Sequence, residues 1–297
     1  MKTSLFILIL FVPFMINAQS TSPQLTTSSG AYYSNATTSL SWTVGEIATE
    51  TFASGNNILT QGFQQPVSVS ITGVNLDLLV FLEGTYGGTQ MNNTLNTSGV
   101  LPLAQPYSTP PWNYPGSENV SAIPNSNVVD WVLVELRDAN NPASATPATK
   151  IGQQAAFLLK DGSVVGMDGS SILYFNVTVN HNLYVVLWHR NHLGILSANA
   201  LSQSGGVFNY DFSTAATQVY NGTAGYKEIS TGVYGMVAGD ANGDGIINIA
   251  DQNLWNAKAG EKGYKSTDFN MDVQVNNPDK NDFFVPNDGN YNSQVPD

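Results

Sequence analysis

Between Leu76 and about Met236 the chain repeats one pattern, in which short apolar runs are separated by turn-forming residues. The clearest runs are LDLLVFLEG, VVDWVLVELRD, AAFLLKDGSVVG, ILYFNVTV and NLYVVLWHR. Runs of this length and spacing are typical of strands, and none of them has the periodicity of an amphipathic helix. KDGS at residues 160–163 lies between two apolar runs and predicts a hairpin turn. The pattern predicts a mainly β protein with a β-sandwich over residues 67–238.

The composition agrees with a β-rich fold. Hydrophobic residues make up 42% of the 297 residues, which is enough for a packed core, while charged residues make up only 11%. An average soluble protein has roughly 25% charged residues. The polarity comes from Asn, Ser, Thr, Gln and Gly, and the first three compete with helical hydrogen bonds. The chain has no cysteine, so disulfides do not contribute to its stability.

The N-terminus, MKTSLFILILFVPFMINAQS, predicts a signal peptide. A single lysine precedes an apolar run from about Leu5 to Ile16, and the small residue Ala18 follows. The run is short for a membrane span, so we expect cleavage after residue 18 and no integral membrane segment in the mature protein. The expected location is extracellular, either secreted or at the cell surface.

Residues 19–66 predict a small N-terminal β module. Alternating apolar residues at Leu40, Trp42 and Val44 are followed by turn-formers, and the segment ends near Pro66.

Residues 239–297 differ from the rest of the chain in charge. The net charge is −12, and ten of the 22 acidic residues but only four of the ten basic ones lie from Asp240 onward. A tail of this charge attracts cations and repels phosphate backbones, so the sequence argues against nucleic-acid binding. ADQNLWNAKAG, residues 250–260, predicts one short helix that ends at Gly260.

Within this tail, DANGDGIINIAD at residues 240–251 predicts a calcium-binding loop. Oxygen-bearing residues stand at positions 1, 3, 5, 9 and 12, and the glycine at position 6 permits a sharp turn. The alternative is a surface turn rich in Asx and glycine. A second copy, DFNMDVQVNNPD at residues 268–279, has the same spacing and favours calcium, as one or two ions. The candidate ligands are Asp240, Asn242, Asp244, Ile246 (through its carbonyl), Asn248 and Asp251, and Asp268, Asn270, Asp272, Gln274 (through its carbonyl), Asn276 and Asp279.

With its paired loops, the tail resembles a type I dockerin, an EF-hand-like calcium module. The resemblance implies calcium at both loops and a cohesin-like protein as partner. Dockerins use the residues before position 12 for recognition, and these are Ile249-Ala250 and Asn277-Pro278 here, where Ser/Thr pairs are often seen. Val273 replaces the position-6 glycine of the second loop, so that turn is expected to be more strained or shaped differently and to bind calcium more weakly.

Two further resemblances concern the rest of the chain. SLSWTVGEIATETFASGNNILTQGFQQP is similar to an N-terminal repeat of large secreted proteins of Gram-negative bacteria. VVDWVLVELRD, QAAFLLKDG and LYVVLWHRNHLGILSANAL resemble a family described as haemagglutinin-like, which implies surface adhesion.

No catalytic constellation is evident, so we expect a non-enzymatic protein. Of His181, His189 and His192, the last two are three residues apart in WHRNH, and a structural role at a strand end is favoured over a metal pair. Glu135 and Arg137 share one strand face and are expected to form a cross-strand ion pair.

The loop YSTPPWNYPG, residues 107–116, holds Tyr107, Trp112 and Tyr114 among prolines. If these rings are exposed, they predict stacking on a surface glycan. If they are buried, they cap one end of the sandwich, which is the favoured reading.

Together these features predict a secreted, non-catalytic calcium-binding protein that serves in adhesion or extracellular scaffolding. The alternative is a component of polysaccharide catabolism, either a glycan-binding accessory protein or an unfamiliar glycoside hydrolase with a dockerin.

Overall fold

The computed structural model describes residues 29–34, 39–44, 51–54, 57–60 and 71–297. The chain divides into two compact units, residues 1–68 and 69–297. The predicted signal peptide lies outside the described residues.

The described part of the first unit consists of two antiparallel strand pairs. Strand β1 (Ser29–Ser34) pairs with β2 (Ser39–Val44), and β3 (Thr51–Ser54) pairs with β4 (Asn57–Thr60).

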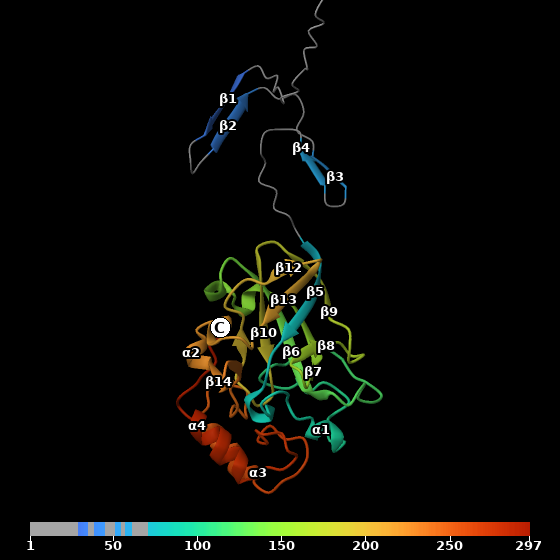
Figure 1. Ribbon diagram of the computed structural model, residues 1–297, viewed down its shortest axis with the longest axis vertical. Coiled ribbons are helices and arrows are strands. Elements are labelled where there is room, and N and C mark those ends of the chain that lie inside the picture. The colour runs from blue at the N-terminus through green and yellow to red at the C-terminus, as the bar shows by residue number, and fades with distance from the viewer. Residues whose placement is uncertain (1–28, 35–38, 45–50, 55–56, 61–70) are drawn as a thin grey trace, which may run out of the picture. The chain divides into compact units, whose positions relative to one another are not determined.

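The second unit is built on one curled sheet of nine strands, shown in Figure 1. Its order is β11-β10-β6-β7-β8-β5-β13-β12, and β9 pairs with β5 outside this path. The strands are β5 (Ile71–Leu79), β6 (Val128–Ala139), β7 (Lys150–Leu159), β8 (Ser163–Val165), β9 (Leu173–Val179), β10 (Asn182–Trp188), β11 (Ile195–Leu196), β12 (Ser202–Ser204) and β13 (Val207–Asp211). A separate hairpin joins β14 (Tyr226–Ser230) to β15 (Val233–Met236).

Strand β6 lies inside the sheet, between β10 and β7, and its mainly apolar sequence, VVDWVLVELRDA, is buried on both faces. Eleven of its twelve residues are buried, including Trp131, which is fully inaccessible. Its neighbours β7 and β10 pair with it in antiparallel register.

The sheet branches at β5, which is why the strands form one hydrogen-bonded sheet and not two separate ones. Along one edge, β5 pairs first with β9 up to Leu76 and then with β8 at Leu78 and Leu79. Its other edge pairs in parallel with β13. The sheet curls so that side chains of β9 lie against β7, where Phe175 and Val177 approach Gly152.

Two local predictions are confirmed. The β7–β8 hairpin turns at Gly162, which has φ +90° and donates its N–H to the carbonyl of Leu159. The predicted tail helix is α3 (Ile249–Lys258), which Asn248 caps through the N–H of Ala250, and Gly260 follows it with φ +89°.

The other described helices are short. They are α1 (Thr94–Thr97), α2 (Gly222–Gly225) and α4 (Val285–Asn287), with 3-10 turns at Glu83–Thr85, Pro142–Ser144, Pro147–Thr149 and Ala216–Gln218 and a π turn at Asp279–Phe284. No helix in the described part of the chain has the length and apolarity needed to cross a membrane.

Residues 239–297 pack onto the sheet and belong to the same compact unit. Helices α3 and α4 lie at the end of the unit opposite β12 (Figure 1). A buried cluster joins the two parts, with Leu193 and Val237 on the sheet side and Trp255, Phe269 and Phe284 in the tail. The close approach of the tail to the sheet side requires a glycine at position 84, because an added Cβ on Gly84 would lie 1.8 Å from the carbonyl oxygen of Phe269.

Candidate metal-binding loops and the cavity beside them

The first acidic loop is folded by its own aspartates. Asp240 accepts hydrogen bonds from the N–H groups of Gly243 (2.8 Å) and Gly245 (3.0 Å). Asp251 accepts from Ala241 (2.8 Å) and Asn248 (2.9 Å), so positions 1 and 12 of the loop are brought to its interior. The two glycines have φ +73° and +83°, which favour residues without a side chain.

The second loop repeats most of this bonding, with the N–H of position 5 in place of that of position 4 as one donor to the first aspartate. Asp268 accepts from the N–H groups of Asp272 (3.1 Å) and Val273 (2.9 Å), and Asp279 accepts from Asn270 (3.1 Å) and Asn276 (2.7 Å).

The second loop achieves the same backbone shape without glycine. Met271 and Val273 have φ +56° and +83° where the first loop has Gly243 and Gly245. A positive φ is a genuine outlier for a β-branched residue and costs on the order of 1–2 kcal/mol. Packing offsets this strain, because the Met271 side chain is 1% exposed and both residues lie against the main core.

Four loop aspartates are buried and form no ion pair within the part of the chain that the structure describes. Asp240, Asp251, Asp268 and Asp279 are each at most 2% exposed, and none forms an ion pair with another described residue. Burial raises the pKa of Asp240 to about 7, and repulsion from Asp251 adds to the effect. Burial likewise raises the pKa of Asp268 to about 7, although Arg190 opposes the shift. Buried carboxylates of this kind favour either a proton or a bound cation.

The available donor atoms fit a hard cation. The position-7 carbonyls, of Ile246 and Gln274, accept no hydrogen bond from any described residue. The side-chain oxygen of Asn276, at position 9, is buried and also lacks a partner among them. No three His, Cys, Asp or Glu side chains of the described chain converge on one metal site, so a cation here requires these amide and carbonyl oxygens as well. An oxygen-only set of this composition suits Ca²⁺.

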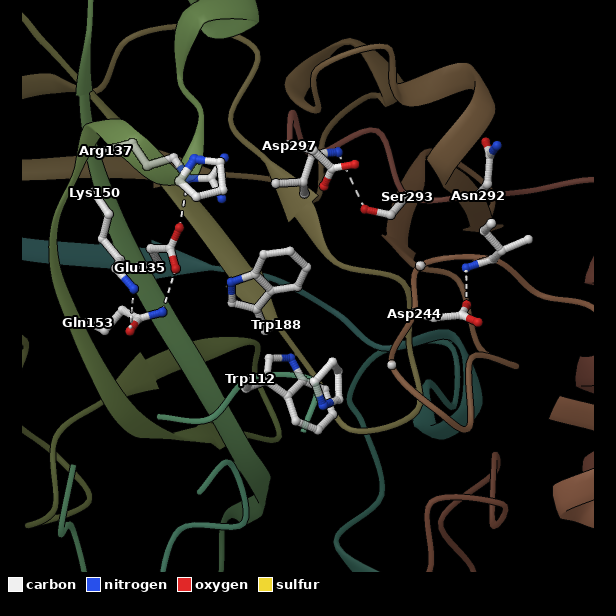
Figure 2. Close-up of a pocket in the computed structure, with 16 residues that line it drawn as sticks. Trp112, Glu135, Arg137, Lys150, Gln153, Trp188, Asp244, Asn292, Ser293 and Asp297 are labelled. Carbon is white, nitrogen blue, oxygen red and sulfur yellow. Dashed lines mark hydrogen bonds and ion pairs between the residues drawn. The ribbon is translucent and has the colours of Figure 1, made fainter. Parts of the chain in front are cut away.

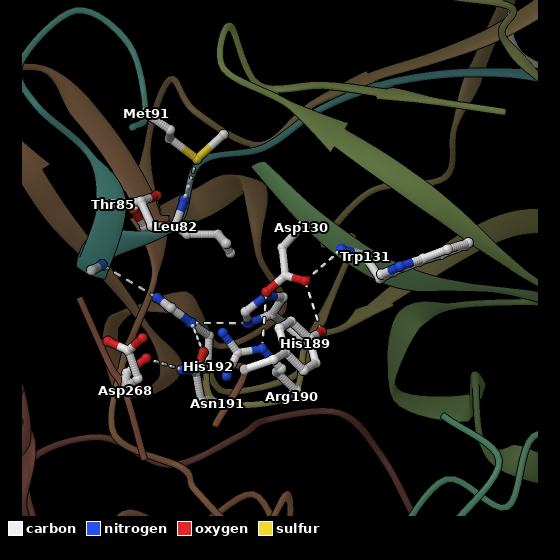
Figure 3. A network of polar contacts seen from close by, with 12 residues as sticks. Leu82, Thr85, Met91, Asp130, Trp131, His189, Arg190, Asn191, His192 and Asp268 are labelled. Atoms are coloured by element: carbon white, nitrogen blue, oxygen red, sulfur yellow. Dashed lines mark hydrogen bonds and ion pairs between the residues drawn. The ribbon is translucent and has the colours of Figure 1, made fainter. Parts of the chain in front are cut away.

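A buried polar network fastens the second loop to the sheet, as Figure 3 shows. Asn191 donates its side-chain N–H to the carbonyl of Asp268 at 2.7 Å. Arg190 donates through Nε to Asp130 at 2.9 Å and through Nη1 to the carbonyl of Lys265, and its guanidinium lies 4.2 Å from the ring centre of Tyr264.

The hydrogen bonds fix the tautomers of two histidines in this network. The N–H of Gly84 points to Nε2 of His192 at 3.3 Å, so the proton of neutral His192 is on Nδ1. That Nδ1 lies 3.0 Å from Nδ1 of His189, whose Nε2 therefore carries the proton and donates to Asp130 at 3.2 Å. Burial lowers the pKa of both histidines, in agreement with two neutral rings.

The three histidines have different surroundings. His189 and His192 are hydrogen-bonded at the end of β10, in the arrangement expected of structural residues. His181 is largely exposed, and its Nδ1 lies 3.3 Å from Asp138.

A cavity of about 540 Å³ lies between the sheet and the first loop. Residues on both sides line it, among them Trp112, Glu135, Gln153, Trp188, Asp244 and Ser293. In Figure 2 the two indole rings lie between the polar strand residues and the loop.

Strand register assembles the sheet side of the cavity. Gln153 on β7 and Val186 on β10 are both direct neighbours of Glu135 on β6, and Trp188 lies on the same face two residues beyond Val186. Glu135 and Arg137 form an ion pair at 2.7 Å, but it lies within strand β6 and does not join two strands as expected. Trp188 and Gln153 were not singled out from the sequence, because only the strand register brings them to Glu135.

Of the three rings in the 107–116 loop, only Trp112 lines the cavity. Tyr107 is fully buried and donates its hydroxyl to the carbonyl of Trp131 at 2.8 Å. Tyr114 is 7% exposed and donates to Glu118. Trp112 packs edge-on against Tyr107, so this buried tyrosine supports the ring that faces the cavity.

No protein-family model matches the chain, and neither the curated proteins nor the solved structures searched for similarity contain a match.

Proposed function

We propose that this is an extracellular, non-catalytic calcium-binding protein that acts in adhesion or scaffolding, with a dockerin-like tail that holds calcium at two loops. The observation that carries the proposal is the set of four buried aspartates, without ion-pair partners among the described residues, at positions 1 and 12 of both loops. Asp240, Asn242, Asp244, Ile246, Asn248 and Asp251 would hold one ion, and Asp268, Asn270, Asp272, Gln274, Asn276 and Asp279 the other.

Calcium in this role is structural. It offsets the charge of carboxylates that are packed against a hydrophobic cluster, and so it stabilises the folded tail and its contact with the sheet. Calcium at 100 times its dissociation constant would stabilise the folded state by about 2.7 kcal/mol.

Calorimetric titration with calcium tests the proposal. Asp244→Ala and Asp272→Ala, made separately and together, remove one exposed ligand from each loop without opening a buried site. We expect two binding events in the wild type, one in each single variant and none in the double variant. Asp282→Ala is the matched control, because it removes the same charge from an exposed tail position outside both loops. No calcium uptake by the wild type would refute the proposal.

A role in polysaccharide breakdown is the second candidate, either as an accessory component or as a hydrolase. The cavity with two tryptophans and a row of polar side chains favours sugar contact. The dockerin resemblance adds a cohesin-like partner, for which the exposed positions before Asp251 and Asp279 are available. Release of reducing ends from a polysaccharide by the purified protein would favour the hydrolase.

A further inference from the structure

We infer that the cavity between the β7-β6-β10 face and the first acidic loop binds a sugar ring of a neutral glycan. The inference deepens the second proposed function, because it names the ligand class and places the site. Its volume of about 540 Å³ is within the usual range of roughly 300–1,000 Å³ for small-molecule sites.

The cavity has two aromatic surfaces. Trp112 and Trp188 are partly buried and line the cavity, and no described residue accepts a hydrogen bond from either indole N–H. A sugar ring has an apolar face of C–H groups and a polar edge of hydroxyls, so it matches indole faces that border polar groups.

The polar groups are held in a fixed row along the strands. Lys150 donates to Gln153 at 3.1 Å, and Gln153 and Arg137 both donate to Glu135, one to each carboxylate oxygen. Each carboxylate oxygen has a second acceptor site, and the ammonium group of Lys150 has further donors. The row therefore offers both donors and acceptors to hydroxyl groups without rearranging.

The charges argue against an anionic ligand. Arg137 is ion-paired with Glu135, and its Nη1 is already bonded to the carbonyls of Ala145 and Pro296. The other charged side chains of the lining are Lys150, Asp244 and Asp297, so carboxylates outnumber cations among them. Such a lining does not select an anion, whereas a neutral ring that uses the indole faces and the hydrogen-bonding groups needs no countercharge.

The first acidic loop forms the wall of the cavity that faces the strands, and it contacts Trp112. An added Cβ on Gly243 would lie 2.9 Å from the Trp112 ring, so the indole packs directly on this glycine of the loop. We therefore expect the loop conformation to affect the sugar site.

Titration of the full chain with oligosaccharides, followed by tryptophan fluorescence and by saturation-transfer NMR, tests the inference. Cello-, xylo-, manno- and chito-oligosaccharides are the probes. We expect saturable binding to at least one of them, weakened tenfold or more (about 1.4 kcal/mol) by Trp188→Ala and by Gln153→Leu. Gln153→Leu keeps the side-chain volume, so it still tests the site if Trp188→Ala does not fold. The control is Tyr174→Ala, an exposed ring on β9 outside the cavity, which should bind like the wild type.

The outcomes separate this inference from calcium binding, which is measured in the same samples. Absence of binding to every probe, or binding that both cavity variants retain, would overturn the sugar site and leave the calcium proposal intact. Binding of tetramethylammonium in place of sugars would also overturn it, since the cavity would then be an aromatic cage for cations. Sugar binding without calcium uptake would leave the inference standing and refute the calcium proposal.

Discussion

Asn191 and Asp268 are joined by a buried hydrogen bond of 2.7 Å, from the amide side chain that follows β10 to the main-chain carbonyl at the first position of the second acidic loop. Asn191 also accepts from Nδ1 of His192 at 2.8 Å, so one side chain connects the histidine network to the loop.

Replacing Asn191 by alanine should therefore affect both stability and calcium binding. A buried carbonyl and a buried imidazole N–H lose a partner, which costs about 1–3 kcal/mol for each group left unsatisfied. We expect a lower melting temperature and weaker calcium binding at the second loop only. Asn209→Ala is the control, because its side chain is exposed and, among the described residues, bonds only to the carbonyl of Val207. Equal loss of affinity at both loops would contradict this assignment.

A methyl group at Gly84 should separate the tail from the sheet. Its Cβ would lie 1.8 Å from the carbonyl oxygen of Phe269, and main chain moves less easily than a side chain. Overpacking of this kind costs about 1–3 kcal/mol or more. Urea unfolding and hydrogen exchange of residues 268–279 would measure the effect of Gly84→Ala. Gly87→Ala, whose nearest new contact is at 3.4 Å, should be close to neutral.

Asp130 is the acceptor on which the buried network depends. It receives bonds from Arg190, His189, the hydroxyl of Tyr264 and the N–H of Trp131. Burial would raise its pKa, but the nearby guanidinium and the hydrogen bonds hold the pKa below its ordinary value.

Asp130→Asn leaves the charge of Arg190 buried without a counter-ion, which should cost about 3–5 kcal/mol. The measurement is the midpoint of urea unfolding, with Asp161→Asn as an exposed control. A change below 1 kcal/mol would show that the Asp130–Arg190 ion pair contributes little to stability.

The pH dependence of the metal-free protein should reveal the loop carboxylates. The pKa of Asp240 and of Asp268 is raised from 3.8 to about 7, so the folded state binds their protons more tightly than the unfolded state does. Their contribution to stability is therefore present below pH 3.8 and is lost as the pH rises to about 7. The lowered pKa values of His189 and His192 act in the opposite direction.

For that reason the quantity to measure is the difference in melting temperature between the wild type and an Asp240→Asn, Asp268→Asn double variant. Between roughly pH 4 and pH 7 the wild type should lose stability relative to the variant when calcium is absent. With calcium present the trend should reverse, because the ion binds the deprotonated carboxylates. A constant difference across this range would mean that these carboxylates titrate normally.

The sequence predicted the local features of this fold well. The β7–β8 turn at Gly162 and the capped helix α3 depend on residues that are neighbours in the chain, so their signals are local. The branch of the sheet at β5 was not predictable in this way, because it depends on which distant strands share one edge.

The same distinction applies to the site. The loop ligands follow a spacing within twelve residues, and the shape of both loops results from aspartates that bond to nearby N–H groups. Val273 was expected to make the second loop either more strained or differently shaped. Its φ of +83° equals that of Gly245, so the backbone has the same shape, and the positive φ at a β-branched residue corresponds to the strained alternative. Whether its calcium affinity is weaker stays a prediction. The contact of Gly84 with the tail and the neighbours of Glu135 required the tertiary structure.

The hydrogen bond from Arg137 to the carbonyl of Pro296 has a consequence for the order of assembly. Arg137 is on β6, and this acceptor lies 159 residues further along the chain. Strand β6 therefore gains this bond only when a contact of long sequence separation has formed. Contacts this distant in sequence slow folding and prolong the exposure of apolar strands. The second unit should consequently acquire its final stability in one late step.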